Sequence, residues 1–132
     1  MQFKITSVKY LIVFFILGFF IYTGYSLYTY AHDSPYIWTP EKAKKAIQEG
    51  RVDIVLDVRT KIEKDVFGSY PGSFHIPVAE IEQRLEKEFP NKGTRFLVYC
   101  NTGQRARNAV EKMRSMGYNY SYYIPTSHVS IL

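Results

Sequence analysis

The chain begins with a long, uninterrupted apolar segment. Residues 10–31 carry no charged side chain. As an α-helix they would extend about 33 Å, enough to cross the roughly 30 Å hydrocarbon core of a bilayer. Charge is absent from every face, which argues against a buried helix of a soluble domain. Aromatic side chains gather at the far end, as they do at membrane interfaces: Tyr22, Tyr25, Tyr28 and Tyr30. The segment therefore predicts one transmembrane helix.

The flanking charges predict the orientation of this helix. Lys4 and Lys9 precede it, and no lysine or arginine follows until Lys42. Under the positive-inside rule, residues 1–9 stay in the cytoplasm. The rest of the chain would then lie on the extracytoplasmic (periplasmic) side as a single-pass membrane protein.

A cleaved signal peptide is the alternative interpretation of the same segment. Thr29 and Ala31 are small enough for cleavage before His32, which would give a secreted or periplasmic protein. However, the apolar segment is longer than the core of a usual signal peptide, and the bulky Tyr28 and Tyr30 flank the site. These features favour an uncleaved signal anchor.

After a short linker at 32–38, the hydrophobic pattern alternates between helical and strand-like spacing. Thr39, Pro40 and Glu41 form a helix start, and Gly50 suits its end. Helical periodicity then recurs at 78–89 and 105–116, with a loop predicted between 59 and 77. Short apolar runs that predict strands lie at 52–58, 95–99 and 120–124. This alternation predicts one α/β domain over 39–132, with a parallel sheet flanked by helices.

Charge and cysteine content restrict the classes of function. The 17 Lys and Arg against 12 Asp and Glu give a net charge of +5. The excess is mild and forms no dense basic run, so the sequence shows no nucleic-acid footprint, whereas a small anionic substrate would suit it. The single cysteine excludes an intramolecular disulfide and a Cys-x-x-Cys redox or zinc motif, so no metal site is predicted.

That cysteine, Cys100, lies where a reactive thiol would be expected. It ends the apolar run 96–99, and a short loop then leads into the helix predicted at 105–116. Backbone N–H groups at a helix N-terminus and a nearby guanidinium stabilise a thiolate. The loop that would supply them consists of Asn101, Thr102, Gly103, Gln104 and Arg105. A small buried hydrophobic cysteine is the competing interpretation, but the strand, loop and helix together favour a nucleophile.

Four motifs in order resemble those of single-domain rhodaneses, over about residues 53–123. They are Leu56-Asp57-Val58-Arg59, Pro71-Gly72-Ser73-Phe74-His75-Ile76-Pro77, Tyr99-Cys100-Asn101-Thr102-Gly103-Gln104-Arg105 and Met116-Gly117-Tyr118. Their pattern looks most like that of the family's small periplasmic phage-shock members. The resemblance implies a small rhodanese-like sheet and sulfurtransferase activity.

The resemblance also implies a mechanism and roles for residues. Cys100 would take sulfane sulfur from thiosulfate or a similar small anionic donor, and a thiol or cyanide would collect it, without a metal or organic cofactor. The loop amides and Arg105 would hold the anionic sulfur. Arg59 would add positive potential and Asp57 would orient a loop group, although a purely structural ion pair between them is an equal alternative. A structural turn role is favoured for His75, and Arg107 is a weaker candidate for the site.

Three further points bear on these expectations. Related cysteine phosphatases and arsenate reductases use Cys-x5-Arg, whereas Ala106 occupies that spacing here, which disfavours phosphatase activity. A non-catalytic, membrane-anchored binding module is the main alternative, although the cysteine and the loop arginine are both present. Where the family continues with a Gly-Gly turn and a closing helix, residues 125–132 stand instead, which predicts a less covered sheet. Neither His32 nor His128 is assigned a role.

Overall fold

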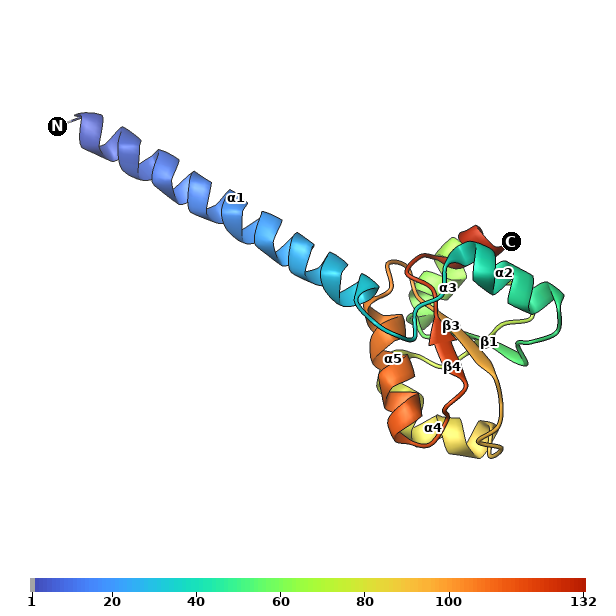
Figure 1. Ribbon diagram of the computed structural model, residues 1–132. Coiled ribbons are helices and arrows are strands. Elements are labelled where there is room, and N and C mark those ends of the chain that lie inside the picture. The colour runs from blue at the N-terminus through green and yellow to red at the C-terminus, as the bar shows by residue number, and fades with distance from the viewer. Residues whose placement is uncertain (1) are drawn as a thin grey trace. The chain divides into compact units, whose positions relative to one another are not determined.

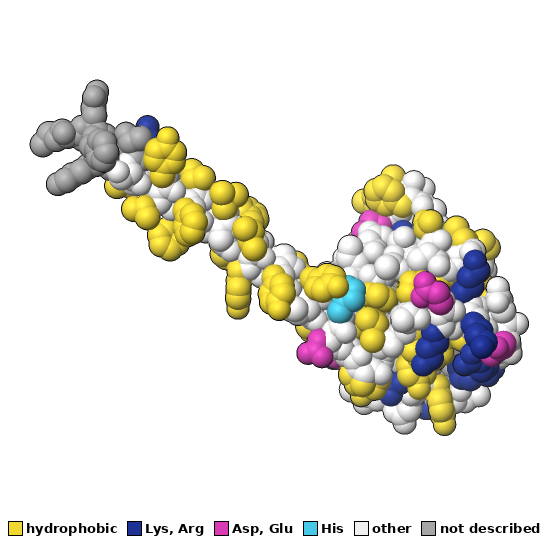
Figure 2. Space-filling view, turned by 45° about the horizontal axis from the view of Figure 1, so that its top comes forward, with side chains coloured by type: hydrophobic (Ala, Val, Ile, Leu, Met, Phe, Trp, Pro, Cys, Tyr) yellow, Lys and Arg dark blue, Asp and Glu magenta, His cyan; other side chains and the backbone are white. Residues whose placement is uncertain are grey.

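The structure, a computed structural model, describes residues 2–132, with side chains from residue 7 onward. The chain divides into two compact units, 1–30 and 31–132. The first unit consists of helix α1 (Gln2–His32), which runs two residues into the second unit. Its apolar side chains from Val8 to Tyr30 are largely exposed (Figure 2). By length and composition, Ser7–His32 could cross a membrane. Met1, which begins the predicted cytoplasmic segment 1–9, lies outside the described residues.

The second unit is built on a parallel sheet of four strands (Figure 1). The order across the sheet is β2 (Phe74–His75), β1 (Ile54–Asp57), β3 (Phe96–Tyr99) and β4 (Ser121–Tyr123). In the register of the two central strands, the last residues of β1 and β3, Asp57 and Tyr99, are partners. The predicted parallel α/β architecture is therefore confirmed, and both central strands end at the same edge of the sheet.

Helices cover both faces of this sheet because its central strands are buried on both sides. One face packs against α4 (Ile81–Glu88) and α5 (Gln104–Ser115), with Leu56, Val98 and Cys100 among the buried residues. The other face holds Val55, Leu97 and Tyr99 against α2 (Pro40–Gln48). Consecutive strand residues thus enter opposite layers, as the period of two requires.

Local capping chemistry explains where several helices begin. Thr39 accepts a hydrogen bond from the Lys42 amide and Pro40 occupies the first turn of α2, as predicted. The loop prediction for 59–77 was wrong in part, because α3 (Lys61–Phe67) and β2 lie there. Thr60 and Glu63 form a capping box that starts α3, a Thr-x-x-Glu signal that the sequence contains. The helix predicted at 78–89 is a short 3-10 turn, η1 (Val78–Glu80), followed by α4.

The C-terminal tail covers the sheet, contrary to the expectation of a less covered face. Its 3-10 turn η2 (His128–Ile131) buries Ile131 in the same cluster as Val55 and Leu97. His128 is buried beside Tyr99, with ring centroids 5.6 Å apart. A short 3-10 turn in the tail therefore covers part of the sheet face that the family's closing helix would be expected to cover.

Candidate functional site

Cys100 follows the last residue of β3 directly and lies just before the N-terminus of α5. Its side chain is only 1% exposed. The backbone N–H of Gly103 donates a hydrogen bond to the Cys100 Sγ, with a nitrogen–sulfur distance of 3.1 Å. An N–H group aimed at sulfur from a helix N-terminus favours a negative charge on that sulfur. The environment therefore differs from that of a cysteine packed only among apolar groups.

Gly103 has to be glycine for this contact to form. Its φ of 98° lies in the left-handed region, and it occupies the cap position of α5. A Cβ at this position would approach the Pro125 Cα to 2.9 Å and the Ala31 Cβ to 3.2 Å. Both the backbone conformation and the neighbouring chain thus exclude a larger residue.

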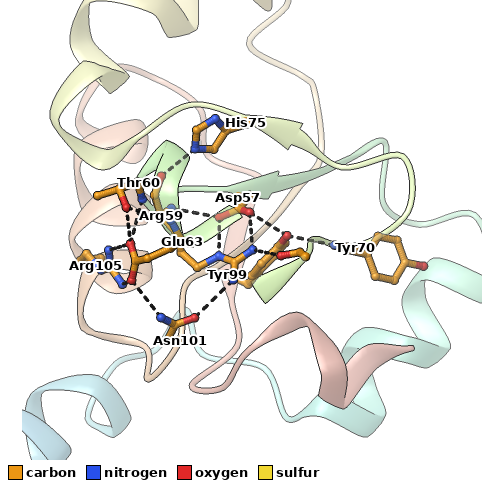
Figure 3. A network of polar contacts seen from close by, with 10 residues as sticks. Asp57, Arg59, Thr60, Glu63, Tyr70, His75, Tyr99, Asn101 and Arg105 are labelled. Carbon is orange, nitrogen blue, oxygen red and sulfur yellow. Dashed lines mark hydrogen bonds and ion pairs between the residues drawn. The ribbon is translucent and has the colours of Figure 1, made fainter. Parts of the chain in front are cut away.

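Asp57 and Arg59 form a buried ion pair beside the cysteine loop (Figure 3). The guanidinium donates from Nε to Asp57 Oδ1 at 3.0 Å and from Nη2 to Oδ2 at 2.7 Å, and Arg59 is 1% exposed. Nη2 also donates to the Gly68 carbonyl at 2.6 Å. Burial would raise the pKa of Asp57, but hydrogen bonds from Arg59 and Tyr99 outweigh it and the pKa lies below its ordinary value.

A second ion pair holds Arg105, the arginine of the cysteine loop (Figure 3). Its Nη1 lies 2.7 Å from Glu63 Oε2 and its Nη2 lies 2.8 Å from Glu63 Oε1. These hydrogen bonds hold the pKa of Glu63 far below its ordinary value, with further lowering by Thr60. The sequence reasoning missed Glu63 as a site residue, although the Thr60 capping box marks it as the third residue of a helix.

Asn101 joins the two ion pairs. Its Nδ2 donates to Glu63 Oε1 at 3.0 Å, and its Oδ1 receives Arg59 Nη1 at the longer distance of 3.5 Å (Figure 3). The residue after the cysteine is thereby tied to α3 and to the loop after β1. Each arginine faces a carboxylate, so the positive potential that the sequence predicts from Arg59 and Arg105 is largely cancelled. The Gly103 N–H group, aimed at the Cys100 sulfur, is left as a donor for an anionic sulfur.

The other candidates lie in different settings. The Thr102 hydroxyl donates to Gln104 Oε1, so these two side chains bond to each other on the loop. Arg107 pairs with Glu111 one turn along α5 at 2.9 Å. His75 Nε2 lies 2.7 Å from the Arg59 carbonyl oxygen, a contact that fits the structural role favoured for it. His128, to which the sequence analysis assigned nothing, lines a cavity together with Arg59 and Asn101.

The single cysteine lies at the carboxyl end of a central parallel strand, and its loop leads into the start of a helix. These features place the domain in the class of α/β proteins with a cysteine-bearing loop. The sequence matches the rhodanese-like domain over residues 39–126, and the chain belongs to that family. The resemblance found in the four sequence motifs is thus confirmed.

Two curated relatives and one solved structure illustrate this membership. Thiosulfate sulfurtransferase PspE of Escherichia coli is 35% identical over 49 residues, covering 37% of this chain and 47% of the relative. The human thiosulfate:glutathione sulfurtransferase is 31% identical over 97 residues, covering 64% of this chain and 82% of the relative. The structure of the human single-domain sulfurtransferase TSTD1 matches with a TM-score of 0.61 at 24% identity, over 74% of this chain and 95% of that one.

The names of these relatives show that sulfur transfer is an activity of the family. The chain spans only 19% and 47% of the length of two of the curated relatives that it matches. It shares the rhodanese-like region with them, and substrates and partners do not follow from that shared region alone.

Proposed function

We propose that this chain is a membrane-anchored sulfurtransferase that carries sulfane sulfur as a persulfide on Cys100. The observation that supports this most directly is the Gly103 N–H group, which donates to the Cys100 Sγ at 3.1 Å. A donor in this position stabilises the thiolate before reaction and the anionic persulfide after it. The cysteine loop surrounds this sulfur and keeps the donor in place. It consists of Asn101, Thr102, Gly103, Gln104 and Arg105.

The loading step transfers one sulfur atom from an anionic donor such as thiosulfate. The Cys100 thiolate attacks the outer sulfur of the donor and a new S–S bond forms. The S–S bond of thiosulfate breaks, and its electron pair leaves with sulfite. The protein then holds Cys–S–S⁻, which keeps the single negative charge that the thiolate carried.

The discharge step returns the cysteine to its starting state. A thiol or cyanide attacks the outer sulfur of the persulfide, and the electron pair of the Cys100 S–S bond returns to Sγ. This sequence is ping-pong chemistry, which needs neither a metal nor an organic cofactor. Asp57 and Arg59 support the loop through their ion pair and the Arg59 contact to Asn101.

Intact mass of the full chain in detergent, before and after thiosulfate, tests this proposal. We expect a gain of about 32 Da, one sulfur atom, that cyanide or a thiol reverses, and no gain in Cys100→Ser. A folded wild type that gains no mass from thiosulfate or from polysulfide would refute sulfur transfer and favour a binding module. Hydrolysis of an aryl phosphate would instead support the phosphatase alternative, which Ala106, buried at the Cys-x5-Arg spacing, disfavours.

The anchor is proposed to remain uncleaved and to place the domain on the extracytoplasmic side. Ala31 is 0% exposed, and its carbonyl accepts a hydrogen bond from the Tyr123 hydroxyl at 2.5 Å. Signal cleavage before His32 would remove this acceptor and a residue that packs within the folded unit. This packing supports retention of residues 1–31.

The mass of the mature chain and its membrane extraction test the anchor. We expect the full-length mass and retention in membranes washed with alkaline carbonate. Protease added to the extracytoplasmic side should remove the domain and leave a membrane-protected fragment. A mature chain that starts at His32, or a domain protected from that protease, would contradict the proposed topology.

A further inference from the structure

Helix α3 presents large apolar side chains to the solvent. None of its seven residues is buried, although three of them are large and apolar. Ile62 is 75% exposed, and Val66 and Phe67 are each 67% exposed. Ile62 and Val66 lie one turn apart and so share a face of the helix. Exposed apolar side chains gathered on one element mark a surface that contacts another protein or a membrane.

Val129 of the C-terminal tail extends this apolar surface. It is 64% exposed, and it lines the same cavity of about 410 Å³ as Phe67 and Asn101. Helix α3 and the tail therefore flank one hollow beside the residue that follows Cys100. We call the exposed apolar side chains of these two elements the apolar rim, which consists of Ile62, Val66, Phe67 and Val129.

The cysteine loop also lies next to the first residue of the second unit, Ala31. A Cβ on Gly103 would lie 3.2 Å from the Ala31 Cβ and 2.9 Å from the Pro125 Cα. Ala31 is fully buried, and its carbonyl accepts the Tyr123 hydroxyl. Pro125 leads into the tail that carries Val129. The cysteine loop, the tail and the start of the second unit thus converge.

The length of the apolar segment indicates how near the membrane this convergence lies. With residues 10–31 across the bilayer, a helix of about 33 Å spans a hydrocarbon core of about 30 Å. Ala31 then stands close to the edge of that core, and the headgroup layer beyond it is only about 5–7 Å thick. Because Ala31 is buried within the second unit, the folded domain begins at the bilayer surface.

The charges of α3 indicate an attraction that depends on apolar burial. The helix carries two lysines, one glutamate and one aspartate, which balance. Lys61 Nζ pairs with Asp65 Oδ2 at 2.8 Å, and Glu63 is held by Arg105. An interfacial segment inserts its apolar side chains about 5–10 Å into the boundary between headgroups and acyl chains. Balanced charges with exposed apolar side chains suit such an insertion into uncharged lipid.

We propose that the apolar rim docks on the surface of the bilayer that α1 spans, so that the cysteine loop faces the lipid headgroups. This inference rests on the proposed membrane anchor. Removal of the four side chains from water supplies the attraction. The anchor keeps the lipid at a high effective concentration, so even a small apolar surface is occupied. A protein partner would have to displace lipid that is always present.

Tryptophan fluorescence of the full chain in phosphatidylcholine vesicles tests this docking. Bromine on the acyl chains near the glycerol backbone quenches a tryptophan that lies at that depth. Trp38→Phe removes the single native tryptophan, and Phe67→Trp or Tyr120→Trp then adds one probe. Tyr120 is the matched control, because it is 54% exposed and precedes β4, at the sheet edge opposite Cys100. We expect the brominated lipid to remove most of the emission of Phe67→Trp and little of that of Tyr120→Trp.

A probe in the middle of α1 separates failure of the anchor from failure of the docking. Phe15→Trp should be quenched by lipid brominated at the ends of the acyl chains. If it is not, the anchor is refuted and the docking with it. If Phe15→Trp is quenched and Phe67→Trp is not, the docking alone is refuted. A blue shift of Phe67→Trp without quenching would assign the rim to a protein surface, such as a second copy of this chain.

Charged variants of the rim test the nature of the attraction. Ile62→Glu and Val66→Glu change exposed positions, so the fold should tolerate them. In the chain that carries Phe67→Trp, each should abolish most of the quenching, because a carboxylate resists transfer into lipid. Concentrated sodium chloride should leave the quenching of the parent chain unchanged, since the charges of α3 balance. Quenching that survives both glutamates, or that salt removes, would overturn docking by apolar contact.

Discussion

Arg105 and Glu63, 42 positions apart in the chain, meet through two nearly parallel hydrogen bonds of 2.7 and 2.8 Å. The pair joins the first turn of α5 to the first turn of α3. Glu63 also receives the Thr60 backbone N–H at 2.9 Å and the Asn101 amide at 3.0 Å. One carboxylate thus closes a helix cap, pairs with the loop arginine and holds the residue after Cys100.

Glu63→Gln should make the free energy of unfolding less sensitive to a fall in pH below neutral. The pKa of Glu63 is lower in the folded state than in the unfolded state, so its stabilisation is fully present above its ordinary value of 4.5. That stabilisation is lost as the pH falls from 4.5 towards the folded value. Urea unfolding between pH 7 and pH 3 measures it. The variant should lose about 1 kcal/mol at neutral pH and converge on the wild type in acid; parallel curves would contradict the assignment.

Asp57→Asn should be far more damaging than an equivalent change in an exposed pair. It leaves the buried Arg59 guanidinium without its carboxylate, and breaking a buried pair costs about 3–5 kcal/mol. Asp53→Asn is the matched control, because Asp53 pairs with Arg95 in the same bidentate way but with both side chains partly exposed. We expect that control to cost less than about 1 kcal/mol in urea unfolding. Similar losses from both variants would contradict the importance of burial.

Gly103→Ala should impair sulfur loading as well as stability. The substitution meets Pro125 at 2.9 Å and a φ of 98°, so relief of strain must move the N–H that donates to Cys100. Gly50→Ala controls for the backbone alone, since Gly50 has a φ of 68° and open space around it. Each should cost about 1–3 kcal/mol. Only Gly103→Ala should slow persulfide formation from thiosulfate, by about tenfold or more, as loss of an oxyanion-type donor does.

Reagent size should govern the alkylation of Cys100. With 1% of the side chain exposed, a small reagent such as iodoacetamide should react much faster than a bulky maleimide. In urea both should react freely, because the loop no longer shields the sulfur. The ratio of the two rates, folded against unfolded, is the measurement. A bulky reagent that reacts equally fast with the folded chain would show that the loop does not restrict access.

The sequence predicted the architecture and the place of Cys100 because these depend on local patterns. The apolar run ending at Cys100 and the periodic positions of α5 are both visible in the chain. Glu63 was missed as a site residue because its role depends on a contact 42 positions away. Its Thr60-x-x-Glu63 capping box could have predicted helix α3, although not the partner of that carboxylate.

The residues of the tail were beyond sequence reasoning for a similar reason. Nothing near His128 in the sequence indicates that it packs beside Tyr99 or that it lines a cavity together with Asn101. Ile131 likewise covers the sheet only because η2 folds onto α2. Such positions depend on the path of the whole chain, whereas helix starts and buried strands depend on a few neighbouring residues.

The burial of Cys100 has a consequence for the lifetime of the enzyme outside the cytoplasm, where the proposed topology places it. A second protein thiol cannot easily reach the shielded Sγ, so mixed disulfides and overoxidation of the resting enzyme are disfavoured. Loading adds a sulfur about 2 Å beyond Sγ, one S–S bond length away. We expect the loaded sulfur to be easier to reach than the empty cysteine, so that an acceptor meets a more accessible reactive centre when there is sulfur to collect.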